Sequence, residues 1–139
     1  MAGFTLLELL MVIVLMAVAL GVLSFGLGRG LDAARERQSL RDIVAALRQA
    51  RTQSVLSGQP SQVRFDLPGH RFQAQGQKVG HWPSDLDLQL TTAAELGPAV
   101  AFFPDGSSSG GHVLLARGEQ QWRIDVGWLN GGVRLQALQ

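Results

Sequence analysis

The segment that decides the fold runs from Phe4 to Leu27 and reads FTLLELLMVIVLMAVALGVLSFGL. At a rise of about 1.5 Å per residue, a helix of this length extends roughly 36 Å, and the hydrocarbon core of a membrane is roughly 30 Å thick. The segment has no polar stripe, and the first 28 residues hold one charged side chain, Glu8, of the 12 basic and 11 acidic ones in the chain. The sequence therefore predicts a helix that inserts into a membrane.

The residues around this segment exclude several classes of protein. A removable secretory signal needs basic residues ahead of its apolar core, and Met1, Ala2 and Gly3 supply none. The absence of Cys excludes a lipoprotein signal, a disulfide framework, a thiol nucleophile and a Cys-ligated metal site. The length of 139 residues allows one domain, and a formal net charge of +1 disfavours nucleic acid as a partner.

Glu8 is the unexpected residue of the apolar segment, because a carboxylate inside a membrane costs a few kcal/mol at mid-depth. Thr5-x-x-Glu8 matches the capping box, in which side chains bond the free amide groups at a helix start. Alternatively, Glu8 pairs with a cation after insertion. The spacing alone leaves both roles open.

Gly3-Phe4-Thr5-Leu6-Leu7-Glu8, followed by the apolar run, resembles the processing site of type IV prepilins and type II secretion pseudopilins. In that family a prepilin peptidase cuts after the Gly and N-methylates the new terminal Phe. The resemblance implies that residues 1–3 are a leader, that the cut separates Gly3 from Phe4, and that Phe4 is methylated. It also implies an assembly role for Glu8, which would pair with the terminal amine of a neighbouring subunit and set the axial register.

The leader departs from the family pattern in its charge. Leaders of this family usually carry Lys or Arg, which holds the N-terminus in the cytoplasm, whereas the nearest basic side chain here is Arg29, beyond the apolar segment. Only the α-amine then orients the chain, unless the natural start lies upstream or a partner orients the helix.

The helix is expected to continue as an amphipathic segment over residues 29–58, after a membrane and assembly segment over residues 4–28. Leu40, Ile43, Val44, Leu47 and either Ala50 or Val55 recur with helical spacing. Most arginines of this segment fall elsewhere and are interpreted as a solvated face. Gly58 and Pro60 mark the end of the helix.

Residues 59–139 change to a period of two and predict an antiparallel β domain of about six or seven short strands. Turns rich in Gly, Pro, Asp and Asn separate the apolar runs, including a turn over residues 76–80. Since about 80 residues of short strands make a marginal core alone, the apolar face of the helix is expected to cover a sheet. The fold class is thus α+β: one long N-terminal helix packed on an antiparallel β domain, as in pilins.

The segment from Asp105 to Gly111, DGSSSGG, is the most conspicuous internal motif. It resembles a loop of H-type minor pseudopilins and their FimT-like relatives. Its residues predict a flexible connection between two strands. No Gly-Lys-Ser/Thr pattern supports phosphate binding, and no base is identifiable that would make one of its serines a nucleophile. The candidate partner contacts are this loop and two Trp residues beside turns: Trp82, Asp105, Gly106, Ser107, Ser108, Ser109, Gly110, Gly111 and Trp128.

These features predict a structural protein rather than an enzyme, without metal or cofactor, because His70, His81 and His112 lie far apart in the sequence. The first hypothesis is a minor pseudopilin near the tip of a type II secretion pseudopilus. It would be a single-pass protein of the bacterial inner membrane with its β domain in the periplasm. Its partners would be other minor and major pseudopilins, the prepilin peptidase, the secretion platform and secreted substrates. The alternatives are a FimT-like minor pilin that serves fibre assembly or DNA uptake, and a membrane-anchored periplasmic enzyme or binding domain.

Overall fold

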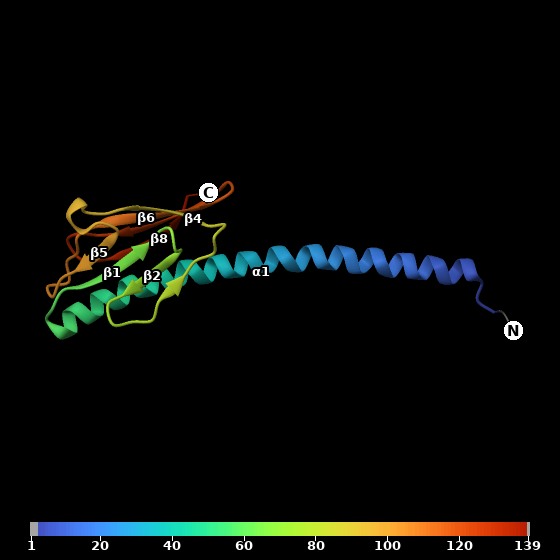
Figure 1. The fold of residues 1–139 in the computed structure, drawn as a ribbon, viewed down its shortest axis with the longest axis horizontal. Helices are drawn as coiled ribbons and strands as arrows, with labels where there is room; N and C mark the ends of the chain where they lie inside the picture. Colours follow the sequence, from blue (N-terminus) through green and yellow to red (C-terminus); the bar gives the residue numbers. More distant parts are fainter. Residues whose placement is uncertain (1–2, 139) are drawn as a thin grey trace. The chain divides into compact units, whose positions relative to one another are not determined.

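The computed structural model describes residues 3–138, so Met1 and Ala2 of the predicted leader and the terminal Gln139 lie outside the described residues. The chain divides into two compact units, Met1–Arg35 and Glu36–Gln139. The helix α1, Leu6–Ser57, contributes to both units and is coloured blue to green in Figure 1. We call the two units the N-terminal unit and the C-terminal unit.

The N-terminal unit contains the apolar part of α1. Every Leu, Ile, Val, Met and Phe side chain from Phe4 to Leu31 is exposed to the surroundings. An 18-residue window of this helix has a mean hydropathy of 2.9 with none of it buried, so its length and composition suffice to cross a membrane. This part of the helix is apolar on all sides, and its surface is therefore available to lipid or to other helices.

In the C-terminal unit, α1 buries one stripe of side chains. The buried positions are Glu36, Ser39, Leu40, Ile43, Val44, Leu47, Ala50 and Ser54. Of the two alternatives at the end of the predicted stripe, Ala50 is buried, whereas Val55 is 47% exposed. The helix ends at Ser57, and Gly58 follows with φ of +70°, the left-handed conformation that only Gly adopts without strain.

Residues 3–138 contain eight strands in two four-stranded antiparallel sheets. Sheet A has the order β3-β2-β1-β5 and sheet B the order β4-β6-β7-β8. The bounds are β1 Ser61–Asp66, β2 Arg71–Ala74, β3 Gly80–His81, β4 Asp87–Thr91, β5 Ala99–Phe102, β6 Gly111–Arg117, β7 Gln120–Val126 and β8 Val133–Ala137, with a short 3-10 helix over Ala94–Leu96.

The two sheets and the second part of α1 share one core. Ile43 and Leu47 of α1, Phe65 and Phe102 of sheet A, and Leu115 of sheet B are all fully or almost fully buried in it. In Figure 1 the green end of α1 runs beside β1 and β2. This arrangement confirms the α+β fold of a helix packed on antiparallel strands.

The number and grouping of the strands differ from the sequence prediction. The expected count of six or seven is too low, because β3 was assigned to a turn. Its two residues, Gly80 and His81, have no alternating pattern and become a strand only by pairing with Phe72 and Arg71. The division of the strands into two sheets also could not be predicted from the alternating pattern, because it depends on which strands pair with one another.

Candidate functional site

The first candidate site is the start of α1. The N–H of Glu8 donates to Oγ1 of Thr5 over 3.2 Å, and the N–H of Leu9 donates to the Thr5 carbonyl over 3.1 Å. Thr5 is therefore the N-cap of the helix and Glu8 its third residue, and one of the two hydrogen bonds of a capping box is formed. The cap uses the backbone amide of Glu8 and leaves its carboxylate available.

The Glu8 carboxylate has no hydrogen bond or ion pair with any of residues 3–138. It is exposed on a helix surface that is otherwise made of large apolar side chains. A carboxylate in such surroundings is stabilised by a cation, and the more so where water is excluded. The geometry thus separates the two roles that the sequence left open: Thr5 caps the helix, and the Glu8 side chain remains available for a partner.

Gly3 and Phe4 precede the first turn of the helix and are not hydrogen-bonded into it. The Phe4 side chain is 88% exposed. The peptide bond between these two residues therefore lies in an accessible, non-helical segment directly ahead of the capped turn. A protease can bind such a segment as an extended chain without unwinding the helix.

The second candidate site is the loop between β5 and β6, which joins sheet A to sheet B. The expected flexible connection is instead held by hydrogen bonds along its length. Ser109 donates its N–H to the Ala101 carbonyl over 2.9 Å and accepts the Ala101 N–H at Oγ over 3.0 Å. Ser107 Oγ and N–H donate to Asp105 Oδ1 over 2.6 and 3.0 Å. These bonds to Ser107 hold the pKa of the Asp105 carboxyl below its usual range.

This loop is also bonded to the loop between β7 and β8. Ser108 donates its N–H to the Trp128 carbonyl over 2.9 Å and its Oγ–H to the Gly127 carbonyl over 2.8 Å. Arg51 of α1 connects both loops, because its Nε donates to the carbonyls of Gly106 and Asn130 over 3.2 and 3.0 Å. A Cβ at Gly131 would collide with the Gly106 carbonyl oxygen, so Gly131 permits this close approach. We call residues 103–110 and 127–132 together the loop pair.

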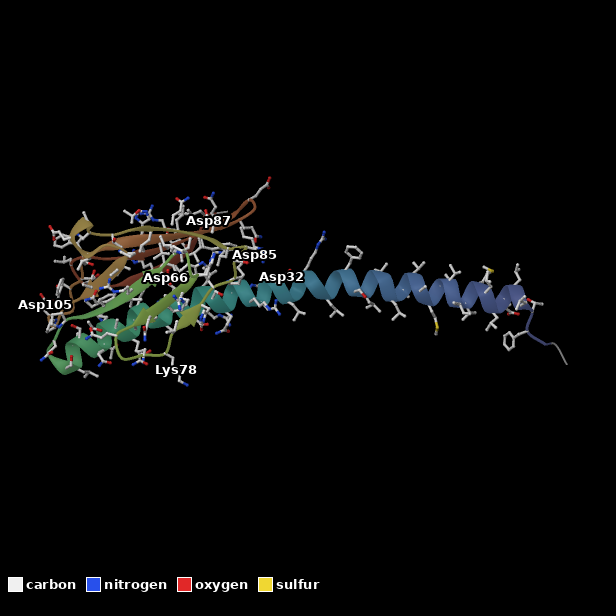
Figure 2. The ribbon with its side chains drawn as sticks, in the orientation of Figure 1. Asp32, Asp66, Lys78, Asp85, Asp87 and Asp105 are labelled. Carbon is white, nitrogen blue, oxygen red and sulfur yellow. The ribbon has the colours of Figure 1, made fainter. Side chains whose placement is uncertain are left out.

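The loop pair presents some predicted contact residues and buries others. Trp128 is 69% exposed, and Asp105 is exposed at one end of the domain, away from Asp85 and Asp87 (Figure 2). Ser108, Gly106 and Gly110 are buried, and Ser107, Ser109 and Gly111 are half-buried. Phe103 and Leu129, which the sequence analysis did not single out, are exposed beside them. The accessible part of the loop pair is therefore Phe103, Asp105, Trp128 and Leu129.

Trp82 is not available to a partner in this structure, so its prediction as a contact residue is wrong. Only 4% of its surface is exposed. Its ring lies 6.3 Å from that of Phe72 and 6.4 Å from that of Phe65, centroid to centroid. The neighbouring turn suggested a surface position, but the long side chain reaches from the turn into the core.

Two arginines of α1 make contacts that helical spacing did not predict, although Arg48 is exposed and only Arg51 is half-buried. Arg51 holds the loop pair, and Arg48 donates to the Val133 carbonyl over 3.3 Å. Both bonds join α1 to backbone carbonyls more than 50 residues away in the sequence. Helical periodicity predicts that Arg48 and Arg51 lie outside the apolar stripe, but it does not predict that a carbonyl from a distant segment will lie within reach of their side chains.

Glu36 is a further residue that sequence reasoning missed. It is 6% exposed and pairs with Arg117 of β6, whose Nη1 lies 3.1 Å from Glu36 Oε2. The other Nη of Arg117 lies 3.2 Å from Asp85 Oδ2. As a charged residue, Glu36 is expected on the polar face of the helix. Its spacing could have predicted its burial, because it lies one helical turn before Leu40 on the buried stripe.

No metal centre accompanies these sites among the described residues. Residues 3–138 contain no group of three or more His, Asp or Glu side chains that could hold an ion. What the described residues do offer is a carboxylate without a partner among residues 3–138 on an apolar helix, and a hydrogen-bonded loop pair with exposed aromatic side chains.

A capped apolar helix with one unpaired carboxylate, continued into a two-sheet β domain, defines the class of pilin-like subunits. The family model for the type II transport protein GspH matches residues 39–131. Type II secretion system protein H of Xanthomonas campestris pv. campestris is 37% identical over 99% of this chain and 84% of that protein. The chain belongs to the GspH family, the minor pseudopilins of type II secretion systems.

Solved structures agree on the fold. The minor pseudopilin EpsH of the Vibrio cholerae type 2 secretion system matches with a TM-score of 0.61, at 20% identity over 74% of this chain and 97% of that one. The type IV minor pilin FimU of Pseudomonas aeruginosa matches with a TM-score of 0.60, at 11% identity over 77% of this chain and 95% of that one. The fold is thus common to both fibre systems, whereas the sequence similarity favours type II secretion.

Proposed function

We propose that this minor pseudopilin is a structural, non-catalytic subunit that enters the type II secretion pseudopilus at or near its tip. The observation that carries the proposal is the Glu8 carboxylate, which lacks a partner among residues 3–138 on an exposed apolar helix. An isolated charge there is unfavourable in a low-dielectric environment and favourable once a cation is supplied. Assembly with a second subunit supplies that cation.

The cation is the terminal amine created by processing. A prepilin peptidase would cut between Gly3 and Phe4 and methylate Phe4, and methylation keeps the positive charge. The accessible, non-helical position of Gly3 and Phe4 ahead of α1 supports such a cut. After removal of residues 1–3, Glu8 is the fifth residue, and its carboxylate would bind the amine of a neighbouring subunit. This pairing would fix how far one helix is shifted along the next.

The apolar segment over residues 4–28 would hold the subunit in the bacterial inner membrane before assembly. The amphipathic segment over residues 29–58 would then carry the β domain of residues 59–139 in the periplasm. The exposed apolar surface of the N-terminal unit supports this storage role. Release into the fibre would exchange lipid for the apolar helices of other subunits.

The accessible part of the loop pair would contact other pseudopilins or secreted substrates. Exposed aromatic side chains on a hydrogen-bonded backbone bind a partner with a small loss of conformational entropy. The bond from Ser108 holds the backbone of Trp128, and the bonds from Ser107 hold the Asp105 carboxylate. This supports a structured contact surface rather than a flexible tether.

The decisive experiment compares Glu8→Gln and Gly3→Ala with wild type in cells that express the other pseudopilins and the peptidase. Glu8→Gln should be cleaved and N-methylated normally, as measured by the mass of the mature chain, yet be absent from sheared fibres. Gly3→Ala should retain residues 1–3. A matched control is Glu95→Gln, an exposed carboxylate of the β domain, which should assemble normally. Entry of Glu8→Gln into fibres at the wild-type level would refute the assembly role.

A further inference from the structure

The outer edge of sheet B at β8 is a second, separate candidate for binding. β8 pairs with β7 on one side only, with Val133 opposite Val126, Leu135 opposite Ile124 and Ala137 opposite Trp122. Beyond both ends of this ladder, Leu138 donates to Gln121 over 2.8 Å and Gly127 donates to Gly132 over 2.9 Å. In an antiparallel pair, hydrogen-bonded and non-hydrogen-bonded positions alternate. Val133, Leu135 and Ala137 are therefore the positions whose N–H and C=O groups point away from β7.

Other contacts among the described residues cover parts of the free edges but leave Leu135 and Ala137 of β8 uncovered. At one end of β8, Arg48 of α1 donates to the Val133 carbonyl over 3.3 Å. In sheet A, the edge of β5 is covered by Ser109, which exchanges two hydrogen bonds with Ala101. Within residues 3–138, no hydrogen bond joins the outward groups of Leu135 and Ala137 to another part of the domain. An edge of this kind is a template for an added strand.

A groove lies against the same stretch of β8. It has a volume of about 330 Å³ and is lined by Leu40, Trp122, Leu135 and Ala137, with Arg37 and Arg41 of α1 beside them. Leu135 is 42% exposed, so the apolar lining is accessible from outside. Neither the Arg37 nor the Arg41 side chain has a hydrogen bond or ion pair with any of residues 3–138. The open edge thus combines backbone donors and acceptors, an apolar groove and two available positive charges.

We propose that β8 binds an extended segment of a different protein chain as an additional strand of sheet B. Outward groups of Leu135 and Ala137 bond the backbone of that strand. An apolar side chain of the strand fills the groove against Leu40 and Trp122, and its carboxylates face Arg37 and Arg41. Because side chains two positions apart share one face of a strand, the partner segment carries its apolar and acidic residues two positions apart. This site uses none of the residues of the loop pair and none near Glu8.

A second copy of this chain does not meet these requirements. Its other free edge in sheet B is β4, which carries the acidic Asp87 and would complement the arginines in charge. However, Leu88 of β4 is buried in its own core, and Leu90 is packed against that core. A β4 edge could add backbone bonds but could not fill the groove. The apolar side chain must come from a segment that is not already packed in a core.

The test uses the full chain in nanodiscs and a short fluorescein-labelled peptide in which Val and Glu lie two positions apart, with Ser between them, so that both face the same side. Binding should slow amide hydrogen exchange at Leu135 and Ala137 but not at Arg134 and Gln136, whose N–H groups already face β7. Ala137→Pro removes an outward N–H without removing a bond to β7, so the sheet should persist. It should weaken peptide binding about tenfold, which corresponds to about 1.4 kcal/mol.

Charge is tested separately by Arg41→Glu, which should weaken binding of the acidic peptide by a similar factor and reduce its salt dependence. The matched control is Arg64→Glu, an equal charge change on sheet A that should leave binding unchanged. The proposal is overturned if wild type does not bind the peptide, if Ala137→Pro binds as well as wild type, or if exchange slows equally at Gln136. It is also overturned if raising the protein concentration or the lipid content alone protects Leu135 and Ala137.

Discussion

The two parts of α1 belong to one helix but meet different surroundings. From Phe4 to Leu31 every large apolar side chain is exposed, whereas from Leu40 to Ala50 a single stripe is buried in the core of the C-terminal unit. Each part has one notable carboxylate. Glu8 is unpaired among the described residues, and Glu36 is buried against Arg117.

The contrast shows that apolar character alone does not stabilise a folded domain. In the second part, burial against strands removes the stripe from water and contributes to the free energy of unfolding. In the first part, the same residue types are not buried within the chain, so they contribute no such stabilisation there. Their burial requires lipid or other helices. Substitutions should therefore affect stability in one part and membrane insertion or assembly in the other.

The largest expected effect is that of Leu47→Ala. Leu47 is fully buried on the stripe, so its truncation should lower the free energy of unfolding by about 2–5 kcal/mol through lost burial and a cavity. Urea unfolding of the full chain in detergent, followed by tryptophan fluorescence, measures this change. Leu15→Ala, in the exposed part, should change it by less than about 0.5 kcal/mol. If both variants lowered the free energy of unfolding equally, the proposed difference between the two parts of α1 would be contradicted.

A smaller loss is expected for Glu36→Gln. The variant leaves the Arg117 guanidinium without its buried carboxylate, but Asp85 remains as a partner, so the loss should be about 1–3 kcal/mol. Glu8→Gln should leave the unfolding of the domain within about 0.5 kcal/mol of wild type. The same urea titration compares the two variants. If Glu36→Gln were neutral and Glu8→Gln destabilising, the assigned roles would be reversed.

Two serines give a finer comparison within the same helix. Ser54 is fully buried and donates its Oγ–H to the Phe102 carbonyl over 3.1 Å, whereas the exposed Ser24 donates to the Leu20 carbonyl over 2.9 Å in its own helix. Ser54→Ala should reduce stability by about 1 kcal/mol, because a buried carbonyl loses its donor. Ser24→Ala should be neutral in urea unfolding. A loss at Ser24 matching that at Ser54 would contradict the view that burial decides the effect.

The smallest effect is a dependence of stability on acidic pH in the C-terminal unit. The pKa of the Asp66 carboxyl is held below its ordinary value of 3.8, first by the side-chain hydrogen bond from Arg71 and then by the N–H of Gly69. The pKa of Asp105 is lowered by Ser107. Because both folded pKa values are depressed, their stabilisation is present above the ordinary value and is lost as pH falls through the folded values.

Thermal unfolding measured from neutral to strongly acidic pH checks this sign. The melting temperature should fall below about pH 4, and Asp66→Asn with Asp105→Asn should reduce that fall. Asp42→Asn, at an exposed carboxylate of α1, serves as the control. A melting temperature that rises on acidification would contradict the assigned directions.

The sequence predicted the elements better than their contacts. The apolar run, the stripe from Leu40 to Ala50 and the end of the helix at Gly58 follow from local periodicity and capping, which require only neighbouring residues. Trp82 and Arg51 were misjudged because their roles depend on residues far away in the chain. The loop from Asp105 to Gly111 was predicted to be flexible for the same reason, since Trp128 and Ala101 supply its bonding partners.

The sequence by itself determined that the chain has an apolar helix start with one acidic residue, an amphipathic continuation and a β-rich remainder. These properties depend on residue type and spacing along the chain. Only the structure decided that the Glu8 side chain is left without a partner among the described residues. It also decided that Trp82 is core while Trp128 is exposed, and that β8 keeps an open edge. Burial and pairing are set by the packing of distant segments, which no local pattern specifies.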